Sequence, residues 1–102
     1  MKRDYIVTRS NWNGIEIEVR WNRNYLVYDD QTHMAHLEVM SVKPERAPLP
    51  ITETGYKSHF THVAAVDGFD SPEAFVEAWL DHASGETQWR EAQAARAQLS
   101  LF

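Results

Sequence analysis

The chain has 102 residues, of which 43% are hydrophobic and 25% charged, and its formal net charge at pH 7 is −5. This length and composition predict a single ordinary globular domain. Cysteine is absent, which excludes disulfides, thiolate chemistry and cysteine-based zinc sites. No apolar run is long enough for a membrane span or a secretion signal, so we expect a cytoplasmic protein without a membrane partner.

The charge is unevenly distributed along the chain. Residues 1–50 carry seven Lys or Arg and seven Asp or Glu, whereas residues 51–102 carry three and eight. Phosphate neutralisation needs clustered cations, so we expect no direct nucleic-acid binding by the C-terminal half. An alternative function is that of an acidic DNA mimic or other protein-binding inhibitor that uses the face from Asp67 to Glu86. The simpler interpretation of these acids is a solvated helix face.

Alternating apolar and polar residues predict strands at the beginning of the chain. Tyr5–Thr8 suits a short strand, and Asn11–Gly14 suits a turn because Asn-Gly tolerates positive φ. Every second residue of Ile15–Trp21 is apolar, which is typical of a half-buried antiparallel strand. Asn22–Asn24 predicts another turn, and Tyr25–Tyr28 predicts the start of a third strand.

The last clear strand pattern is followed by a break. In Ala35–Val42, Leu37 and Val39 share one face while His36, Glu38 and Met40 share the other. The prolines of Lys43–Pro50 exclude a helix or a central strand there. The following residues as far as Phe60 surround a glycine turn at Gly55.

The run PLPITETGYKSHF, from Pro48 to Phe60, resembles a signature in small bacterial proteins of plasmids and other mobile elements. No activity is established for those proteins. The resemblance therefore implies a mobile-element context and no particular chemistry.

Helices are expected in the last third of the chain. Val63–Phe69 suits a last strand or a packed loop. Ser71-Pro72-Glu73 predicts a helix start with Ser as N-cap and Pro at the first position. This helix, Ser71–Ala83, has an apolar stripe that should lie across the sheet; its members are Phe75, Val76, Trp79 and Leu80. A second helix is expected from about Glu86 to Leu99, with little apolar surface beyond Trp89.

These elements predict an α+β fold: a small antiparallel sheet of three to five strands in meander order, one packed helix and a C-terminal helix. We expect two parts, an α+β globular domain of residues 1–84 and a segment of residues 85–102 that holds the C-terminal helix and a terminal docking peptide.

Two groups of residues invite a chemical interpretation. The pairs His33/His36 and His59/His62 have H-x-x-H spacing, but on a strand residues three apart point to opposite faces, so we predict no metal site and no cofactor. A small enzyme or metal-binding protein that uses the Glu53–His62 loop remains an alternative. The possible second site comprises Glu53, Gly55, Tyr56, Lys57 and His59. Without evidence of a pocket, we expect no enzyme and no catalytic residue.

The N-terminal half interleaves cations with aromatic residues, as single-strand stacking surfaces do. The set consists of Arg9, Trp12, Arg20, Trp21, Arg23, Tyr25 and Tyr28. Trp21 shares the face of Ile15, Ile17 and Val19, so it is better explained as part of the core.

The C-terminal pentapeptide is amphipathic, with an amide first, a polar spacer and two large apolar residues at the end; it is Gln98, Leu99, Ser100, Leu101 and Phe102. An exposed apolar tail indicates a pocket that receives it, on its own domain or on a partner. QLSLF resembles the bacterial β sliding-clamp-binding motif, which occurs in DNA polymerases, mismatch-repair proteins and replication regulators. The resemblance implies that Leu101 and Phe102 fill an apolar pocket and that the Gln98 amide anchors the peptide. It also implies that Leu99 and Ser100 shape the backbone between them.

The leading hypothesis is a non-enzymatic bacterial accessory protein, encoded by a mobile element, that docks on the β sliding clamp of DNA polymerase III through this peptide. Such a short peptide would bind with modest affinity, and two or three anchor residues would supply most of the energy.

Overall fold

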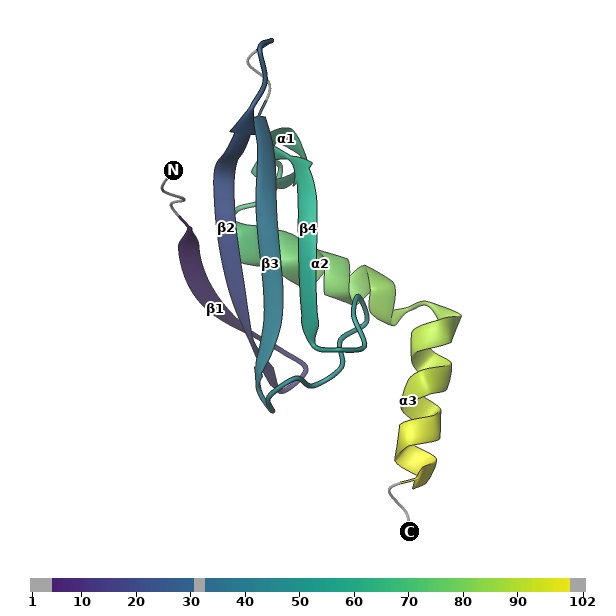
Figure 1. Ribbon diagram of the computed structural model, residues 1–102. Helices are drawn as coiled ribbons and strands as arrows, with labels where there is room; N and C mark the ends of the chain where they lie inside the picture. The colour runs from purple at the N-terminus through teal and green to yellow at the C-terminus, as the bar shows by residue number, and fades with distance from the viewer. Residues whose placement is uncertain (1–4, 31–32, 100–102) are drawn as a thin grey trace.

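The structure, a computed structural model, describes residues 5–30 and 33–99, with side chains as far as Ala97. Four strands precede three helices (Figure 1): β1 (Ile6–Trp12), β2 (Ile15–Val27), β3 (His33–Lys43), β4 (Tyr56–His62), α1 (Val63–Asp67), α2 (Pro72–Ser84) and α3 (Thr87–Leu99). The strands form one antiparallel sheet in the order β1-β2-β3-β4. The predicted α+β class and meander are therefore confirmed.

The turns and breaks of the sheet follow from local sequence. Asn13 and Gly14 occupy positive φ values of 50° and 83° between β1 and β2, as a two-residue hairpin turn requires. The proline-rich stretch after β3 is a loop, and Leu49 of this loop is fully buried in the core.

Asn22–Asn24 does not form the predicted turn. β2 continues through it to Val27, and the register with β3 shifts between Asn22 and Leu26. The Asn22 side chain accepts a hydrogen bond from the Asn24 backbone N–H at 3.1 Å. This local bond is compatible with a bulge as well as with a turn, so Tyr25–Val27 extends β2 and no separate third strand begins there.

The segment after β4 also differs from the prediction, because residues 63–67 form the short helix α1 instead of a strand or a loop. Val63 and Val66 are both buried in the core. Residues three apart share a face on a helix and point to opposite faces on a strand. The helical conformation therefore lets both valines pack against the sheet.

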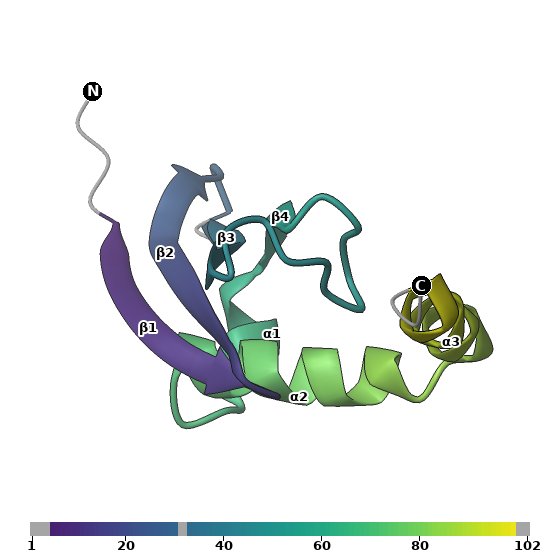
Figure 2. The same cartoon turned by 90° about the horizontal axis from the view of Figure 1, so that it is seen from below.

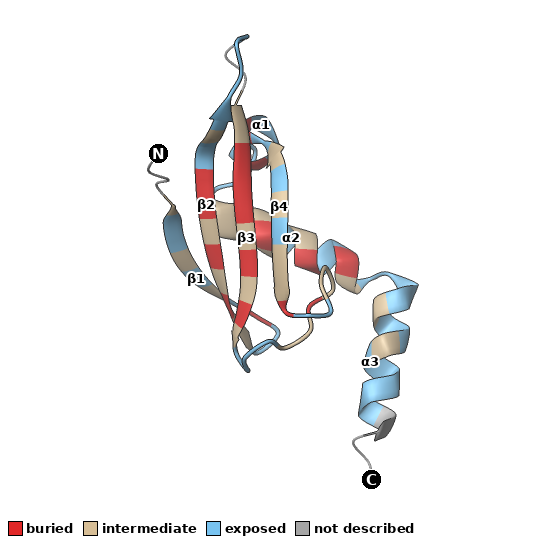
Figure 3. Cartoon of the chain, viewed as in Figure 1, coloured by how far each residue is buried: buried red, intermediate tan, exposed pale blue. Residues whose placement is uncertain are grey.

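α2 begins and packs as predicted. The Ser71 hydroxyl accepts a hydrogen bond from the Ala74 backbone N–H at 3.1 Å, and Pro72 occupies the first turn. α1 and α2 lie on one side of the sheet (Figure 2). The core lies between that face and α2, and Figure 3 shows the buried residues of the sheet mainly on β2 and β3 and further ones on α2. Its fully buried side chains include Ile17, Val19, Leu37, Val39, Val76 and Leu80.

None of the three described helices covers the opposite face of the sheet (Figures 1 and 2). The register places His36, Glu38 and Met40 of β3 on this open face, as the alternation predicted. No helix within residues 5–30 and 33–99 has the length and hydropathy needed to cross a membrane.

Candidate functional site

The predicted docking peptide continues from α3. Gln98 and Leu99 are the last two residues of that helix. Their side chains, together with Ser100, Leu101 and Phe102, lie outside the described residues. The structure does describe the support of the peptide: α3 leaves the globular body and runs away from the sheet (Figure 1). Most of its side chains between Thr87 and Ala97 are exposed.

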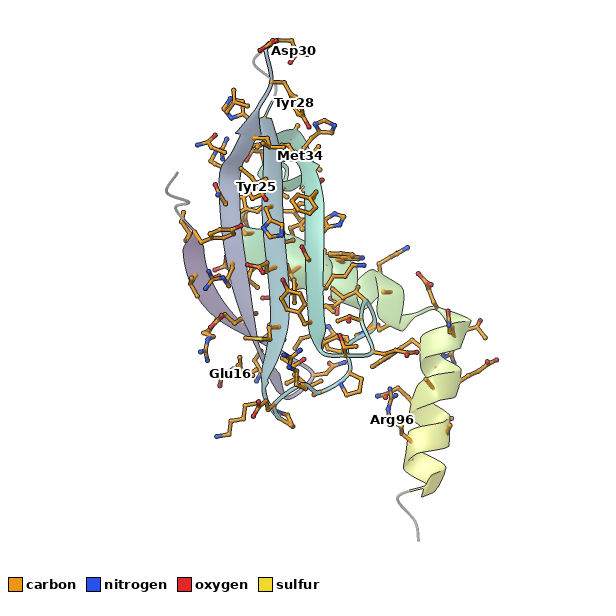
Figure 4. The ribbon with its side chains drawn as sticks, in the orientation of Figure 1. Glu16, Tyr25, Tyr28, Asp30, Met34 and Arg96 are labelled. Atoms are coloured by element: carbon orange, nitrogen blue, oxygen red, sulfur yellow. The ribbon has the colours of Figure 1, made fainter. Side chains whose placement is uncertain are left out.

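α3 is attached to the body through one face near its beginning. Trp89 packs against the core, and the Arg96 guanidinium lies 5.2 Å from the centre of the Trp89 ring. Figure 4 shows Arg96 pointing from α3 back toward the body. A cleft of about 200 Å³ separates this face of α3 from the loop at Leu49–Glu53. The helix is therefore held at Trp89 and contributes little else to the core.

The second predicted set does not meet in one place. Glu53 is exposed and lines the cleft beside α3. Tyr56 lies on the open face of the sheet, whereas Lys57 and His59 belong to the face that α2 covers. His59 stacks at a tilt on Trp79 of α2, with 4.7 Å between the ring centres.

Two members of this set have clear structural roles. Gly55 has a φ of 79°, and a Cβ there would lie 2.7 Å from backbone atoms of Arg46. The absence of a side chain at Gly55 therefore allows the backbone at Gly55 to pack directly against the backbone at Arg46. The Tyr56 hydroxyl donates a hydrogen bond to Glu38, and this bond, with burial, raises the pKa of Tyr56 above its ordinary value of 10.0.

The four histidines of the two H-x-x-H pairs are distributed over three surfaces. His33 and His62 line one shallow cleft with Arg23 and Asp67. His36 is buried on the open face, and His59 faces α2. Among the described residues, no three His, Cys, Asp or Glu side chains gather closely enough to hold a metal ion.

Three of the acids assigned to a DNA-mimic face bond with residues of the sheet. Glu77 accepts a hydrogen bond from Ser10, and Asp81 accepts one from the Trp12 indole at 2.8 Å. Asp67 forms a bidentate ion pair with Arg23, in which the two guanidinium nitrogens lie 3.2 and 3.3 Å from the two carboxylate oxygens. The first two contacts fix α2 against β1, so these carboxylates serve the fold.

The arginines of the cation and aromatic set are also paired with carboxylates. Arg9 contacts Glu16 and Glu18, and Arg20 contacts Glu38. With the Arg23 pair described above, all three guanidinium groups of this set lie beside an acid. The structure places Trp12 and Trp21 in the core, as expected for Trp21.

An aromatic cluster that the sequence patterns did not predict lies on the open face. The buried His36 ring stacks on Phe60, with 4.4 Å between ring centres and an interplanar angle of 18°. Its Nδ1 lies 2.5 Å from the Tyr5 hydroxyl and its Nε2 2.6 Å from the Ser58 hydroxyl. Tyr25 adds a tilted ring at 5.2 Å and lies on this face in Figure 4. The sequence did contain a signal for this cluster, because the strand alternation assigns these aromatic residues to the solvent side of the sheet.

One comparison with known proteins gives a match. The model of a protein family described as the KlcB third domain matches residues 5–89. The match therefore begins just before β1 and ends in the first turn of α3. No curated protein and no solved structure matches the chain.

Proposed function

The chain belongs to the KlcB third-domain family, and on this premise we propose that it is a plasmid-associated bacterial accessory protein that recruits a partner through its C-terminal peptide. The partner is the bacterial β sliding clamp, and the docking residues are Gln98–Phe102. The globular body is the part that the docked peptide brings to the clamp.

The observation that carries this proposal is the course of α3. The helix runs away from the body (Figure 1), and its side chains from Gln93 to Ala97 are exposed. A peptide that begins in the last residues of such a helix, as Gln98 and Leu99 do, would reach a partner without any rearrangement of the core. The family match also ends at Trp89, so the peptide follows the matched domain and adds to whatever that domain does.

The chemistry of the pentapeptide supports the choice of partner. Two large apolar residues, Leu101 and Phe102, follow an amide and a polar spacer, which is the pattern of the clamp-binding motif. Burial of these two side chains in an apolar pocket would supply most of the binding energy, because short peptide ligands depend on a few anchors. The Gln98 amide would add hydrogen bonds that fix the register.

The test is a calorimetric titration of purified bacterial β clamp with the full chain and with a chain that ends at Ala97. We expect micromolar binding by the full chain and none by the shortened one. Leu101→Ala and Phe102→Ala should each weaken binding by about tenfold or more. Glu91→Ala, an exposed change on α3, is the matched control and should bind as the wild type does.

Two results would contradict the proposal. One is the absence of clamp binding by the full chain, and the other is equal affinity for the wild type and Phe102→Ala. Circular dichroism of each variant shows whether the fold is retained, so that loss of binding is assigned to the peptide.

A further inference from the structure

β4 is an edge strand of the sheet that the described residues form. It pairs with β3 alone among the described strands, and it occupies the border of the sheet opposite β1 in Figure 1. In an antiparallel strand, successive residues direct their backbone N–H and C=O groups to opposite sides. The Ser41 N–H donates to the Gly55 C=O at 2.8 Å, so Gly55 and every second residue after it face β3.

This alternation assigns the outward groups. Tyr56, Ser58 and Phe60 must direct their backbone groups away from β3. The Tyr56 C=O accepts a hydrogen bond from the Thr52 hydroxyl at 2.8 Å, which agrees with an outward direction and occupies that group. Within residues 5–30 and 33–99, no backbone hydrogen bond outside the sheet itself reaches Ser58 or Phe60. Their N–H and C=O groups form a free edge that an extended chain can pair with.

An apolar groove lies directly beside this edge, between β4 and α2. It is lined by aromatic rings and one alanine: His59, Phe69, Phe75, Ala78, Trp79 and His82. The aromatic rings contact one another in pairs. The ring centres of Phe69 and Phe75 are 5.3 Å apart, and those of His59 and Trp79 are 4.7 Å apart. Phe69 is 41% exposed, so the groove keeps apolar surface in contact with water.

One lysine, Lys57, lies near the lining residue His59, although the whole chain is negative. No carboxylate is among the residues that line it. The Lys57 ammonium has no ion pair within the described part of the chain. Glu77 and Asp81 of α2 bond with β1 residues at the far side of the helix. Burial and the nearby Lys57 charge lower the pKa of His59. The His59 ring that lines the groove is therefore uncharged at pH 7.

We propose that the β4 edge and the adjoining groove bind an extended peptide segment of a partner protein, which carries a bulky apolar side chain and, two residues away on the same face, an acidic residue. The segment adds a fifth strand next to β4 and bonds with the backbone groups of Ser58 and Phe60. Its apolar side chain enters the groove against Phe75 and Trp79, and its carboxylate lies near Lys57.

The β4 edge and the groove would make different contributions to recognition. Backbone pairing gives affinity without regard to sequence, whereas the groove selects a side chain. Neighbouring residues of a strand point to opposite faces, so the residue next to the apolar anchor would lie over Phe60 on the open face. Phe60 is 52% exposed and would gain burial from a second apolar residue there. Phe60 already stacks on His36, so this contact needs no rearrangement.

The experiment begins with selection from a random heptapeptide display library on the full chain. A selected peptide is then synthesised, and its dissociation constant is measured for the wild type and three variants. Ala78→Arg fills the groove from an exposed position, and Lys57→Glu reverses the charge beside it. Ala95→Arg makes the same change as the first variant at an exposed position of α3 and is the matched control. Amide hydrogen exchange of Ser58 and Phe60 is followed with and without the peptide.

The expected result is enrichment of peptides in which Asp or Glu stands two residues away from a large apolar residue. Ala78→Arg should weaken the selected peptide by about tenfold or more, and Lys57→Glu by about fivefold. Ala95→Arg should bind as the wild type does, and the Ser58 and Phe60 amides should exchange more slowly with peptide bound.

Three results would overturn the proposal. The first is that no peptide is enriched, and the second is that Ala78→Arg binds the selected peptide as the wild type does. The third is that Ser58 and Phe60 are already protected without peptide in a concentration-dependent way. That result would mean that a second copy of the chain pairs with this edge. The site does not involve Gln98–Phe102, so its failure and the failure of clamp docking are separate outcomes.

Discussion

Gly55 shows how a single residue shapes the loop that leads into β4. Its φ of 79° lies in the region that L-residues rarely adopt, and an added Cβ would meet Arg46 backbone atoms at 2.7 Å. Gly14 has a similar φ of 83°, but nothing lies within 4 Å of the Cβ position there. The two glycines therefore separate the cost of the backbone conformation from the cost of the steric clash.

We predict that Gly55→Ala lowers the free energy of unfolding by about 2–4 kcal/mol, because strain and a backbone clash add together. Gly14→Ala should cost about 1 kcal/mol, since it carries the strain alone. Urea denaturation of both variants gives the comparison. Equal losses at the two positions would show that the loop moves to accommodate the new methyl group.

At the residue scale, a local cap could be predicted from the sequence, whereas a contact between distant residues could not. The Ser71 cap was readable from local order, because an N-cap bonds with a backbone N–H only three residues away. The bond between Tyr56 and Glu38 joins residues 18 apart. Such a contact depends on the β3–β4 register, which no local pattern specifies.

At the scale of elements, the contact between β4 and α2 couples stability to pH. His59 of β4 packs on Trp79 of α2, and burial, followed by the charge of Lys57, lowers the pKa of His59 from 6.5. The folded state therefore binds this proton less readily than the unfolded state does. The uncharged His59 therefore contributes its full stabilisation at pH values above the pKa that it has in the unfolded chain. This contribution is lost as the pH falls through the lower pKa that His59 has in the folded protein.

We predict that the free energy of unfolding falls as the pH is lowered from about 7.5 to about 5.5, and that His59→Gln makes this fall smaller. His62→Gln, a change at an exposed residue at the end of β4, is the matched control. Urea denaturation at a series of pH values measures the dependence. A His59→Gln protein with the same pH dependence as the wild type would contradict the assignment.

The buried face of an element was predictable where one period covered the segment. The alternation in Ile15–Trp21 and the stripe of α2 both gave the buried face correctly. The continuation of β2 through Asn22–Asn24 was not predictable, because these residues suit a turn and a bulge equally. Pairing with β3 on both sides of the bulge decides between the two.

At the scale of the whole molecule, the shape is elongated. The principal extents are 56 × 25 × 21 Å and the radius of gyration is 15.4 Å, whereas a compact chain of this length has about 13 Å. Figure 1 shows the reason, since α3 runs away from the body at one end and the β2–β3 hairpin extends at the other.

We predict that the outer part of α3 adds little to stability. A chain ending at Gln93 should lose less than about 1 kcal/mol, because it gives up the Arg96 contact with the Trp89 ring and otherwise exposed residues. A chain ending at Glu86 should lose about 2–3 kcal/mol, because it also removes Trp89 from the core. Thermal and urea denaturation of the two chains test this. Equal losses would mean that α3 is held through its C-terminal half.

The sequence by itself determined the strand faces, the Asn-Gly hairpin turn, the capped start of α2 and the α+β class, because each depends on interactions within a few residues. The tertiary structure alone decided which residues meet across elements. It separated Glu53, Tyr56 and His59, assigned Glu77 and Asp81 to bonds with β1, and set a groove of α2 beside the free edge of β4. The physical reason is that strand register and helix docking depend on the total apolar surface that the whole core buries. That total determines which side chains become neighbours, and no local stretch of sequence specifies it.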